Sequence, residues 1–207
     1  MGAWSDHVVP RMADASLRNE EIGRLRGEVC APARGRVLEL GFGGGLNLRW
    51  YPAAVTSVAA VEPSDVGWRL SAPRRERSPL PVERRGLDGQ HLDEPDASYD
   101  TVVSTFTLCT IPDVARALAE VRRVLRPGGV LCFLEHGLAP DPGVVRWQRR
   151  LEPLQRRIAG GCHLTRDVPA LVRAAGLEPT VARADYLGGP RLNRPWTYAY
   201  LGSATAP

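Results

Sequence analysis

The sequence predicts an α/β protein with a doubly wound, mostly parallel sheet and helices on both faces. Predicted strands alternate with predicted helices along most of the 207-residue chain, as in βαβ units. The first strand, Arg36–Leu40, leads into a glycine-rich turn, and the second ends on a single acid, Glu62. A glycine turn and an acidic strand end are together typical of a site for an adenosine-type ligand, because the carboxylate can accept hydrogen bonds from both ribose hydroxyls.

The glycine turn has the pattern Glu39-x-Gly41-x-Gly43-x-Gly45. Glycines let the backbone approach a ligand closely and adopt positive φ at little cost. An acid at Glu39 would repel a pyrophosphate but suits a ligand with an ammonium or sulfonium charge. No G-x-x-x-x-G-K-[ST] pattern is present, which argues against a phosphate-cradling loop. Taken alone, the turn could also be a glycine-rich connection that binds nothing.

The N-terminal half predicts helices and strands in turn. Val8–Val29 reads as one or two helices, with Pro10 near the start and Pro32 after the end. A helix over Leu46–Trp50 and a strand over Ser57–Glu62 follow the glycine turn. The chain then continues through a short helix from Ser64, a polar, proline-broken crossing over Ser71–Pro81, and strands at Val82–Arg85 and Tyr99–Thr105.

The clearest predicted helix is Val114–Leu125, whose apolar residues recur on one face. Asp113 is a plausible N-cap for it. The sequence Pro127-Gly128-Gly129 ends this helix and starts a strand over Val130–Glu135. Two final strands, Glu178–Tyr186 and Trp196–Gly202, are expected to complete a seven-stranded sheet as a hairpin-like pair, with the last strand antiparallel.

Val144–Ile158 predicts an amphipathic helix with apolar residues opposite a set of arginines. Pro153 should kink this helix or split it in two. A basic amphipathic helix can lie on a membrane surface, but packing over the sheet explains the same apolar stripe and is the preferred interpretation. A short helix running to Ala175 follows the Gly160-Gly161-Cys162-His163 segment.

Composition is that of a soluble globular protein, with 43% apolar and 24% charged residues and a net charge of +4. Every basic residue is arginine, and no basic run is interleaved with stacking aromatics, so nucleic-acid binding is not expected. No apolar stretch approaches the length of a membrane span, and no secretory pattern begins the chain. The four cysteines lack C-x-x-C spacing and read as reduced thiols, which favours a cytoplasmic protein.

Several residues with chemical potential fall just after predicted strand ends, namely Gly41, Glu62, Asp88, Thr105 and His136. Ligands of doubly wound sheets bind beyond the carboxyl ends of the strands. The sequence therefore predicts one site at this edge.

These motifs resemble those of class I S-adenosylmethionine (SAM) methyltransferases, which have a Rossmann-like fold. Val37–Gly45 resembles the family's first motif and Val61–Ser64 its acidic second motif. Asp88-Gly89-Gln90 matches the loop that usually holds the adenine, and Leu125–Gly129 matches the turn after the helix. Phe42 and Gly44 depart from the commoner G-C-G-T-G form of the first motif, but Gly41, Gly43 and Gly45 remain.

A narrower similarity points to the type-11 branch, which includes short bacterial proteins and mammalian membrane-anchored thiol S-methyltransferases. It rests on Thr107–Pro112, Glu135-His136 and Gly161–Arg166. The sequence lacks the hydrophobic N-terminal anchor of the mammalian members, so stable membrane anchoring is not expected. The similarity implies a single methyltransferase domain over residues 1–207, with helices 8–29 and a helical insertion 143–160 covering the substrate site.

The resemblance also implies roles for individual residues. SAM would be held by Glu39, Gly41, Phe42, Gly43, Gly45, Glu62, Pro63, Asp88, Gly89, Gln90 and Thr105. His136 is the first candidate for a catalytic base and His163 the second, although a lone histidine is more often structural. A metal site at Cys162-His163 is disfavoured, because adjacent residues rarely point at one ion and no ligand-spaced partners appear in the sequence.

The predicted function is SAM-dependent methylation of a small-molecule acceptor, with a thiol favoured and S-adenosylhomocysteine (SAH) as the product. O-, N- or C-methylation of a metabolite is the alternative. A binding protein that kept the fold without turnover is the third.

Overall fold

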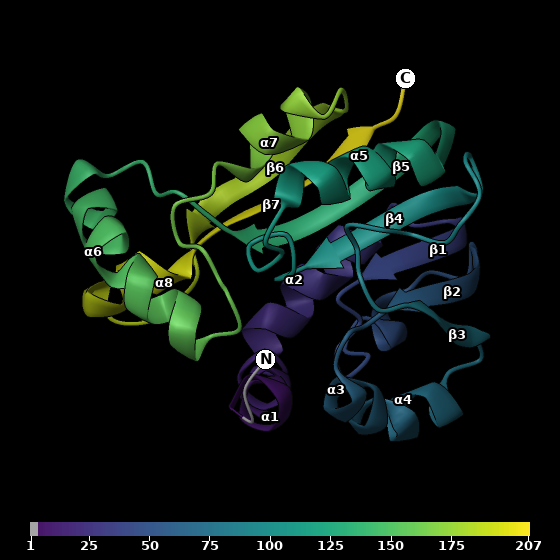
Figure 1. Ribbon diagram of the computed structural model, residues 1–207, viewed down its shortest axis with the longest axis horizontal. Helices are drawn as coiled ribbons and strands as arrows, with labels where there is room; N and C mark the ends of the chain where they lie inside the picture. The colour runs from purple at the N-terminus through teal and green to yellow at the C-terminus, as the bar shows by residue number, and fades with distance from the viewer. Residues whose placement is uncertain (1–3) are drawn as a thin grey trace.

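The computed structural model describes residues 4–207 and contains one seven-stranded sheet in the order β3-β2-β1-β4-β5-β7-β6 (Figure 1). The strands are β1 (Gly35–Leu40), β2 (Val55–Val61), β3 (Val82–Gly86), β4 (Tyr99–Thr105), β5 (Leu125–His136), β6 (Glu178–Tyr186) and β7 (Tyr198–Thr205). The pairs among β1 to β5 are parallel, and β7 runs antiparallel to both of its neighbours. The predicted fold class and the antiparallel last strand are confirmed.

Helices cover both faces of the sheet (Figure 1). They are α1 (Val9–Ser16), α2 (Glu20–Cys30), α3 (Asp65–Leu70), α4 (Ala72–Arg77), α5 (Val114–Val124), α6 (Pro142–Ile158), α7 (Val168–Ala174) and α8 (Arg194–Thr197). Helices α5 and α7 lie on one face and α2 on the other, while α6 and α8 extend beyond the end of the β6–β7 pair. The predicted N-cap of α5 is present, since Asp113 accepts a hydrogen bond from the Arg116 N–H.

The central strands are buried on both faces because alternate side chains enter two separate cores. Leu38 and Leu40 join the core beneath α5 and α7, whereas Val37 joins the core beneath α2. This double burial explains why β1 reads as a nearly continuous apolar run. A one-residue slip of β1 would turn its side chains to the opposite faces, so this burial also fixes the register of the strand. The position of its carboxyl end, where the candidate site lies, is fixed with it.

Several local predictions differ from the structure. The segment Pro127-Gly128-Gly129, predicted as a turn before the strand, lies within β5, and Trp196, predicted to begin the last strand, lies in α8. The helix predicted at Leu46–Trp50 is only a 3-10 turn over Leu48–Trp50 (η2), because the glycine turn occupies the residues before it. The crossing over Ser71–Pro81 contains the helix α4, which has a proline in its first turn. A backbone N–H at that position would have no partner within the helix, so the N–H that proline lacks is not missed. Of the two outcomes predicted for Pro153, a kink or a split, the split does not occur, since α6 runs as one helix to Ile158.

The apolar stripe of α6 does not pack over the sheet as expected. Trp147, Leu154 and Ile158 are 55%, 56% and 44% exposed. The helix is attached instead through the buried side chain of Gln148, which accepts from the Ala139 N–H and donates to the carbonyls of Gly137 and Pro195. Within residues 4–207, no helix has both the length and the apolar character needed to cross a membrane.

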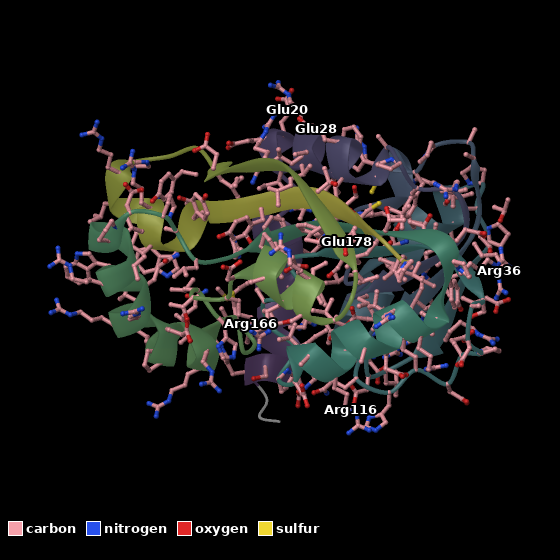
Figure 2. The ribbon with its side chains drawn as sticks, turned by 90° about the horizontal axis from the view of Figure 1, so that it is seen from above. Glu20, Glu28, Arg36, Arg116, Arg166 and Glu178 are labelled. Carbon is pink, nitrogen blue, oxygen red and sulfur yellow. The ribbon has the colours of Figure 1, made fainter. Side chains whose placement is uncertain are left out.

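The labelled residues Arg36 and Arg116 lie at the edges of the molecule (Figure 2). Several other arginines form ion pairs. Arg123 of α5 makes two hydrogen bonds to the Glu120 carboxylate, which also accepts from the Leu92 N–H, so this pair ties the loop after β3 to α5.

We expect Glu120→Gln to destabilise the protein at neutral pH but not in acid. The Arg123 guanidinium lowers the pKa of Glu120 from 4.5 to about 2. A depressed carboxyl pKa contributes stability that is present above about pH 4.5 and is lost as the pH falls toward 2. Allowing for solvent screening, the loss should be about 1–2 kcal/mol at neutral pH.

Urea unfolding at pH 7 and at a pH near 2, where Glu120 becomes protonated in the folded protein, measures this difference. The control is Glu20→Gln, which removes a largely exposed pair with Arg24 and should change stability little at either pH. An equal loss for Glu120→Gln at both pH values would contradict the assignment.

Candidate active site

The glycine turn and the Glu62 carboxylate lie together at the carboxyl ends of β1 and β2. The Gly43 N–H donates to Glu62 Oε2 at 2.5 Å, and the Ser64 N–H donates to Oε1 at 2.7 Å. Burial raises the pKa of Glu62, and these two bonds oppose the rise. An ionised carboxylate has about four acceptor positions, so two remain for a pair of ligand hydroxyls. The chemistry of this pair of groups therefore fits the ribose of an adenosine-type cofactor.

The backbone at Gly41 has no room for a side chain. Its φ is +65°, and a Cβ there would lie 2.0 Å from Thr107 Oγ1. The turn thus passes directly against the loop after β4, which only glycine permits. This close approach brings the ends of β1 and β4 into one site.

We expect Gly41→Ala to cost about 2–5 kcal/mol of stability, from left-handed strain and overpacking together. The matched control is Gly128→Ala, because Gly128 has a similar φ of +72° but no atom within 4 Å of its Cβ position. That variant should lose only about 1–2 kcal/mol, from backbone strain alone. Denaturant unfolding compares the two, and equal losses would show that the contact with Thr107 is unimportant.

A buried polar network supports the glycine turn from below. Glu39 accepts from Asn47 Nδ2 at 2.9 Å and from the Tyr51 hydroxyl at 2.5 Å. Arg26 of α2 donates to Asn47 Oδ1 at 2.7 Å and to Thr105 Oγ1 at 2.8 Å. Burial raises the pKa of Glu39 to about 7, although Tyr51 and Arg26 oppose the rise, and burial lowers the pKa of Arg26.

Two residues predicted to contact the cofactor turn their side chains inward. Glu39 is 1% exposed, and its two oxygens are taken by Asn47 and Tyr51. Phe42 is 2% exposed and packs against Trp68, with ring centroids 5.6 Å apart. Both side chains stabilise the turn, so any contact of Phe42 with a ligand would come from its main chain.

The Asp88 loop lies beside the end of β1 and is held to α5. Asp88 Oδ1 accepts from the backbone and side-chain nitrogens of Gln90, which lowers the pKa of Asp88. Gln90 Oε1 in turn accepts from the Asp113 N–H, and a Cβ on Gly89 would lie 3.3 Å from Leu40 Cδ2. The loop is thus anchored, with the Asp88 side chain half exposed.

The loop after β4 is ordered by the buried carboxylate of Glu135 at the end of β5. Glu135 accepts from the Ser104 hydroxyl at 2.7 Å and from the N–H groups of Thr107 and Cys109 at 3.0 and 3.1 Å. Phe106 has a φ of +55°, uncommon for a residue with a side chain, and its ring lies 4.7 Å from that of His136. The Glu135-His136 pair therefore positions the edge of the site next to β4.

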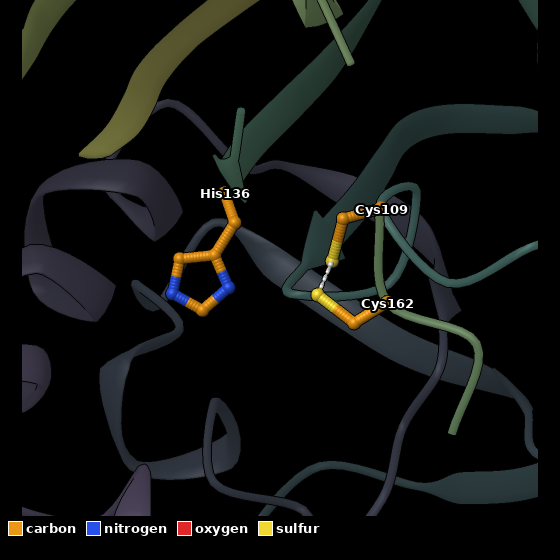
Figure 3. A group of neighbouring side chains, drawn as sticks. All are labelled: Cys109, His136 and Cys162. Atoms are coloured by element: carbon orange, nitrogen blue, oxygen red, sulfur yellow. Dashed lines mark hydrogen bonds between the residues drawn. The ribbon is translucent and has the colours of Figure 1, made fainter. Parts of the chain in front are cut away.

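His136 has two cysteine neighbours that sequence reasoning did not connect with it. The Cys109 and Cys162 sulfurs are 3.7 Å apart, with the His136 ring beside them (Figure 3). The contact with Cys109 lowers the pKa of Cys162 and raises that of Cys109. Only the fold brings these thiols together, since 53 positions separate them in the chain.

His163, the second predicted base, is paired with a carboxylate. Its Nδ1 lies 3.1 Å from Glu152 Oε1, and Glu152 also accepts from the N–H groups of Leu164 and Thr165. The His163 N–H donates to the Cys109 carbonyl at 2.8 Å, which fastens the Gly160–His163 segment to the loop after β4. Arg166 donates to carbonyls of that same loop and lies between α6 and α5 (Figure 2).

The N-terminal segment lies against the site. The Arg74 guanidinium bridges Asp14 of α1 to the Gly44 carbonyl, at 2.8 and 2.7 Å. Trp4 donates to the Ile158 carbonyl, and a Cβ on Gly160 would lie 3.1 Å from Val9. Helix α1 therefore contacts both the glycine turn and the segment that carries Cys162.

Comparison with known proteins agrees with this geometry. Residues 38–133 match the methyltransferase domain family. The human thiol S-methyltransferase TMT1A is 32% identical over 191 residues, which cover 90% of this chain and 78% of the human protein. The chain belongs to the SAM-dependent methyltransferases.

Two further proteins resemble this methyltransferase. The rat thiol S-methyltransferase TMT1B is 39% identical over 135 residues, 63% of this chain and 55% of the rat protein. This methyltransferase therefore matches little more than half of the rat protein's length. A SAM-dependent methyltransferase from Thermotoga maritima has the same fold, with a TM-score of 0.67 and 19% identity over 98% of this chain and 100% of that one.

Proposed function

We propose that the protein transfers a methyl group from SAM to a small-molecule thiol. The observation that carries the proposal is the Glu62 carboxylate, which is held beside the glycine turn with two acceptor positions to spare. The choice of a thiol is supported by the two relatives named thiol S-methyltransferases. We further propose a cytoplasmic location, where the four buried free cysteines would stay reduced.

Binding of SAM is assigned to residues at the strand ends. Glu62 accepts from the ribose hydroxyls, with the exposed Pro63 beside it. Asp88 accepts from the adenine amino group, while the Gly89 N–H meets a ring nitrogen and Gln90 holds the loop. Gly41, Gly43 and Gly45 leave room for the methionine part, near Thr105. Glu39 and the Phe42 ring act indirectly by supporting the turn.

The acceptor is assigned to the edge of the site near His136. SAM supplies an electrophilic methyl group on a sulfonium, and methyl transfer needs an acceptor atom in line with that bond. Positioning therefore supplies much of the acceleration. A thiol with a pKa near 8.5 is already partly ionised at neutral pH. His136 is the first residue that we place at the acceptor; His163, which is held by Glu152, is the second.

An acceptor screen tests this proposal. Alkyl and aryl thiols, phenols and amines are each incubated with protein and SAM, and SAH formation is measured. We expect turnover with thiols that is lost in Glu62→Ala and kept in Glu83→Gln, a change of an exposed acid on β3. Turnover with phenols or amines alone would contradict the choice of a thiol. Tight SAM binding without any turnover would favour a non-catalytic binding protein.

A further inference from the structure

We propose that Cys109, His136 and Cys162 form a binding site for a thiophilic divalent metal ion, with zinc as its natural occupant. These residues come from three separate segments, the loop after β4, the end of β5 and the loop after α6. Their ligand atoms all lie within 4.8 Å of one another. In residues 4–207, no other three cysteine, histidine or acidic side chains are grouped for a metal ion in this way.

The sulfur separation matches a zinc site and not a disulfide. Two thiolates bound tetrahedrally at about 2.3 Å from zinc are about 3.8 Å apart. The Cys109 and Cys162 sulfurs are 3.7 Å apart in this structure. A disulfide needs a separation of about 2.0 Å and gives no part to the histidine. The two sulfurs are already spaced for zinc, and the His136 ring beside them would complete the site by moving toward them (Figure 3).

The surrounding structure holds the cysteines in place before any ion binds. The Cys109 N–H donates to the buried Glu135 carboxylate, and the Cys109 carbonyl accepts from the His163 N–H. The Cys162 N–H donates to the Ala159 carbonyl. Cys109 is 1% and Cys162 5% exposed, whereas His136 is partly exposed. Two buried thiols beside an accessible histidine give a site that is shielded on one side and open on the other.

Three protein ligands leave a fourth coordination position free, as in catalytic zinc sites. We place the acceptor thiol at this fourth position, a step that rests on the proposed function. On binding, the thiol loses its proton to solvent, because a coordinating thiol is deprotonated outright. The thiolate electron pair then forms the new bond to the methyl carbon, while the old carbon–sulfur bond breaks and its pair stays on the cofactor sulfur. The neutral thioether product binds zinc weakly and leaves.

With a metal ion bound, His136 would act as a ligand and not as a catalytic base. As a metal ligand it orients the ion and is not free to accept a proton. His163 remains outside the ligand set, because its Nδ1 faces Glu152. A metal site in this position therefore joins Cys162 with residues distant in sequence, and not with its neighbour His163.

Metal titration tests the site without relying on activity. Metal-free protein is titrated with Zn²⁺ against a chromophoric chelator and, separately, with Co²⁺ while absorption is recorded. We expect one ion per chain and an intense sulfur-to-cobalt charge-transfer band. Cys109→Ser and Cys162→Ser should each weaken zinc binding by about 100-fold or more and reduce the band. His136→Gln should weaken binding while keeping the band.

Cys132→Ser is the matched control, because Cys132 is equally buried but lies outside the cluster. It should leave metal binding unchanged. Absence of the charge-transfer band in folded wild-type protein would overturn the inference, as would a Cys109–Cys162 disulfide in the protein isolated under reducing conditions. Both of these results come from the wild-type protein, so they do not depend on whether the cysteine variants fold.

Adding an alkyl thiol to the Co²⁺ protein tests the fourth position. The thiol should shift the visible absorption bands, and the corresponding alcohol should not. No shift with a thiol that is methylated would overturn the acceptor role. Thiol methylation by protein that binds no metal ion would refute this inference alone. Metal binding without any methyl transfer would refute the proposed function, and with it the acceptor role of the fourth position, but not the metal site.

Discussion

Replacing Glu62 with alanine is expected to abolish measurable SAH binding. Under the proposed function, the substitution removes the hydrogen bonds that two ribose hydroxyls would donate to this charged acceptor, each worth about 1.5–3 kcal/mol. Together they correspond to a loss of about 10²–10⁴-fold in affinity. The variant also releases the Gly43 and Ser64 N–H groups that the carboxylate holds, so the turn itself loses support. Isothermal titration calorimetry measures the effect.

Two companion variants make the result interpretable. Glu62→Gln retains one carbonyl acceptor and should bind SAH with intermediate affinity. Glu83→Gln changes an exposed acid on the neighbouring strand β3 and should bind like the wild type. If Glu62→Ala, checked to be folded by circular dichroism, binds SAH as tightly as the wild type, the assignment of Glu62 is wrong.

The pH dependence of SAH binding gives a second test of Glu62. Burial raises the pKa of Glu62 above 4.5. Protonation removes acceptor capacity, so affinity should fall as the pH drops through this raised value and recover above it. Burial also raises the pKa of Glu39 to about 7, so Glu39 contributes to the same pH dependence. The charge of Arg84 opposes the rise in the pKa of Glu62. Comparison with Glu62→Gln isolates the contribution of Glu62, since only that part of the dependence should disappear.

Arg26→Met is expected to cause the largest loss of stability. Arg26 is 4% exposed and supplies the positive charge of the network beneath the glycine turn. Removing one partner of a buried charged network costs about 3–5 kcal/mol, because Glu39 stays buried without a compensating charge. For a chain of this length the melting temperature should fall by roughly 6–20 °C.

Differential scanning calorimetry checks this prediction, with two controls from the chain. Arg24→Met changes an exposed arginine on the same helix and should have little effect. The double variant Arg26→Met/Glu39→Gln removes both charges and should recover part of the loss. Equal melting temperatures for the Arg26 and Arg24 variants would show that the network is not important for stability.

Much of the fold was predictable because local patterns and tertiary structure agree. The apolar strands β1 and β4, the amphipathic helix α5 with its cap and the glycine turn each have a strong local signal. The stripe on α6 misled the prediction, since Trp147 and Leu154 stay exposed while Gln148 is buried. The contacts that attach this helix run to main-chain atoms far along the chain.

The site was predictable in part, for a related reason. Glu62, Asp88 and His136 directly follow strands, and the ends of parallel strands must meet at one edge. The network of Arg26 and Asn47 depends on where α2 packs against β1. A local sequence pattern does not predict that packing. An arginine on the apolar face of α2, one turn from Ile22, was the available signal. The pairing of Cys109 with Cys162 has no local signal.

A crystal structure of the protein bound to SAH tests the proposed cofactor site as a whole. We predict the ribose hydroxyls on the Glu62 carboxylate, the adenine beside Asp88 and Gly89, and the thioether sulfur at the ends of β1 and β4. In that position the sulfur faces the cluster of Cys109, His136 and Cys162. A nucleoside bound elsewhere on the protein, or a Glu62 carboxylate that does not touch the ribose, would contradict it.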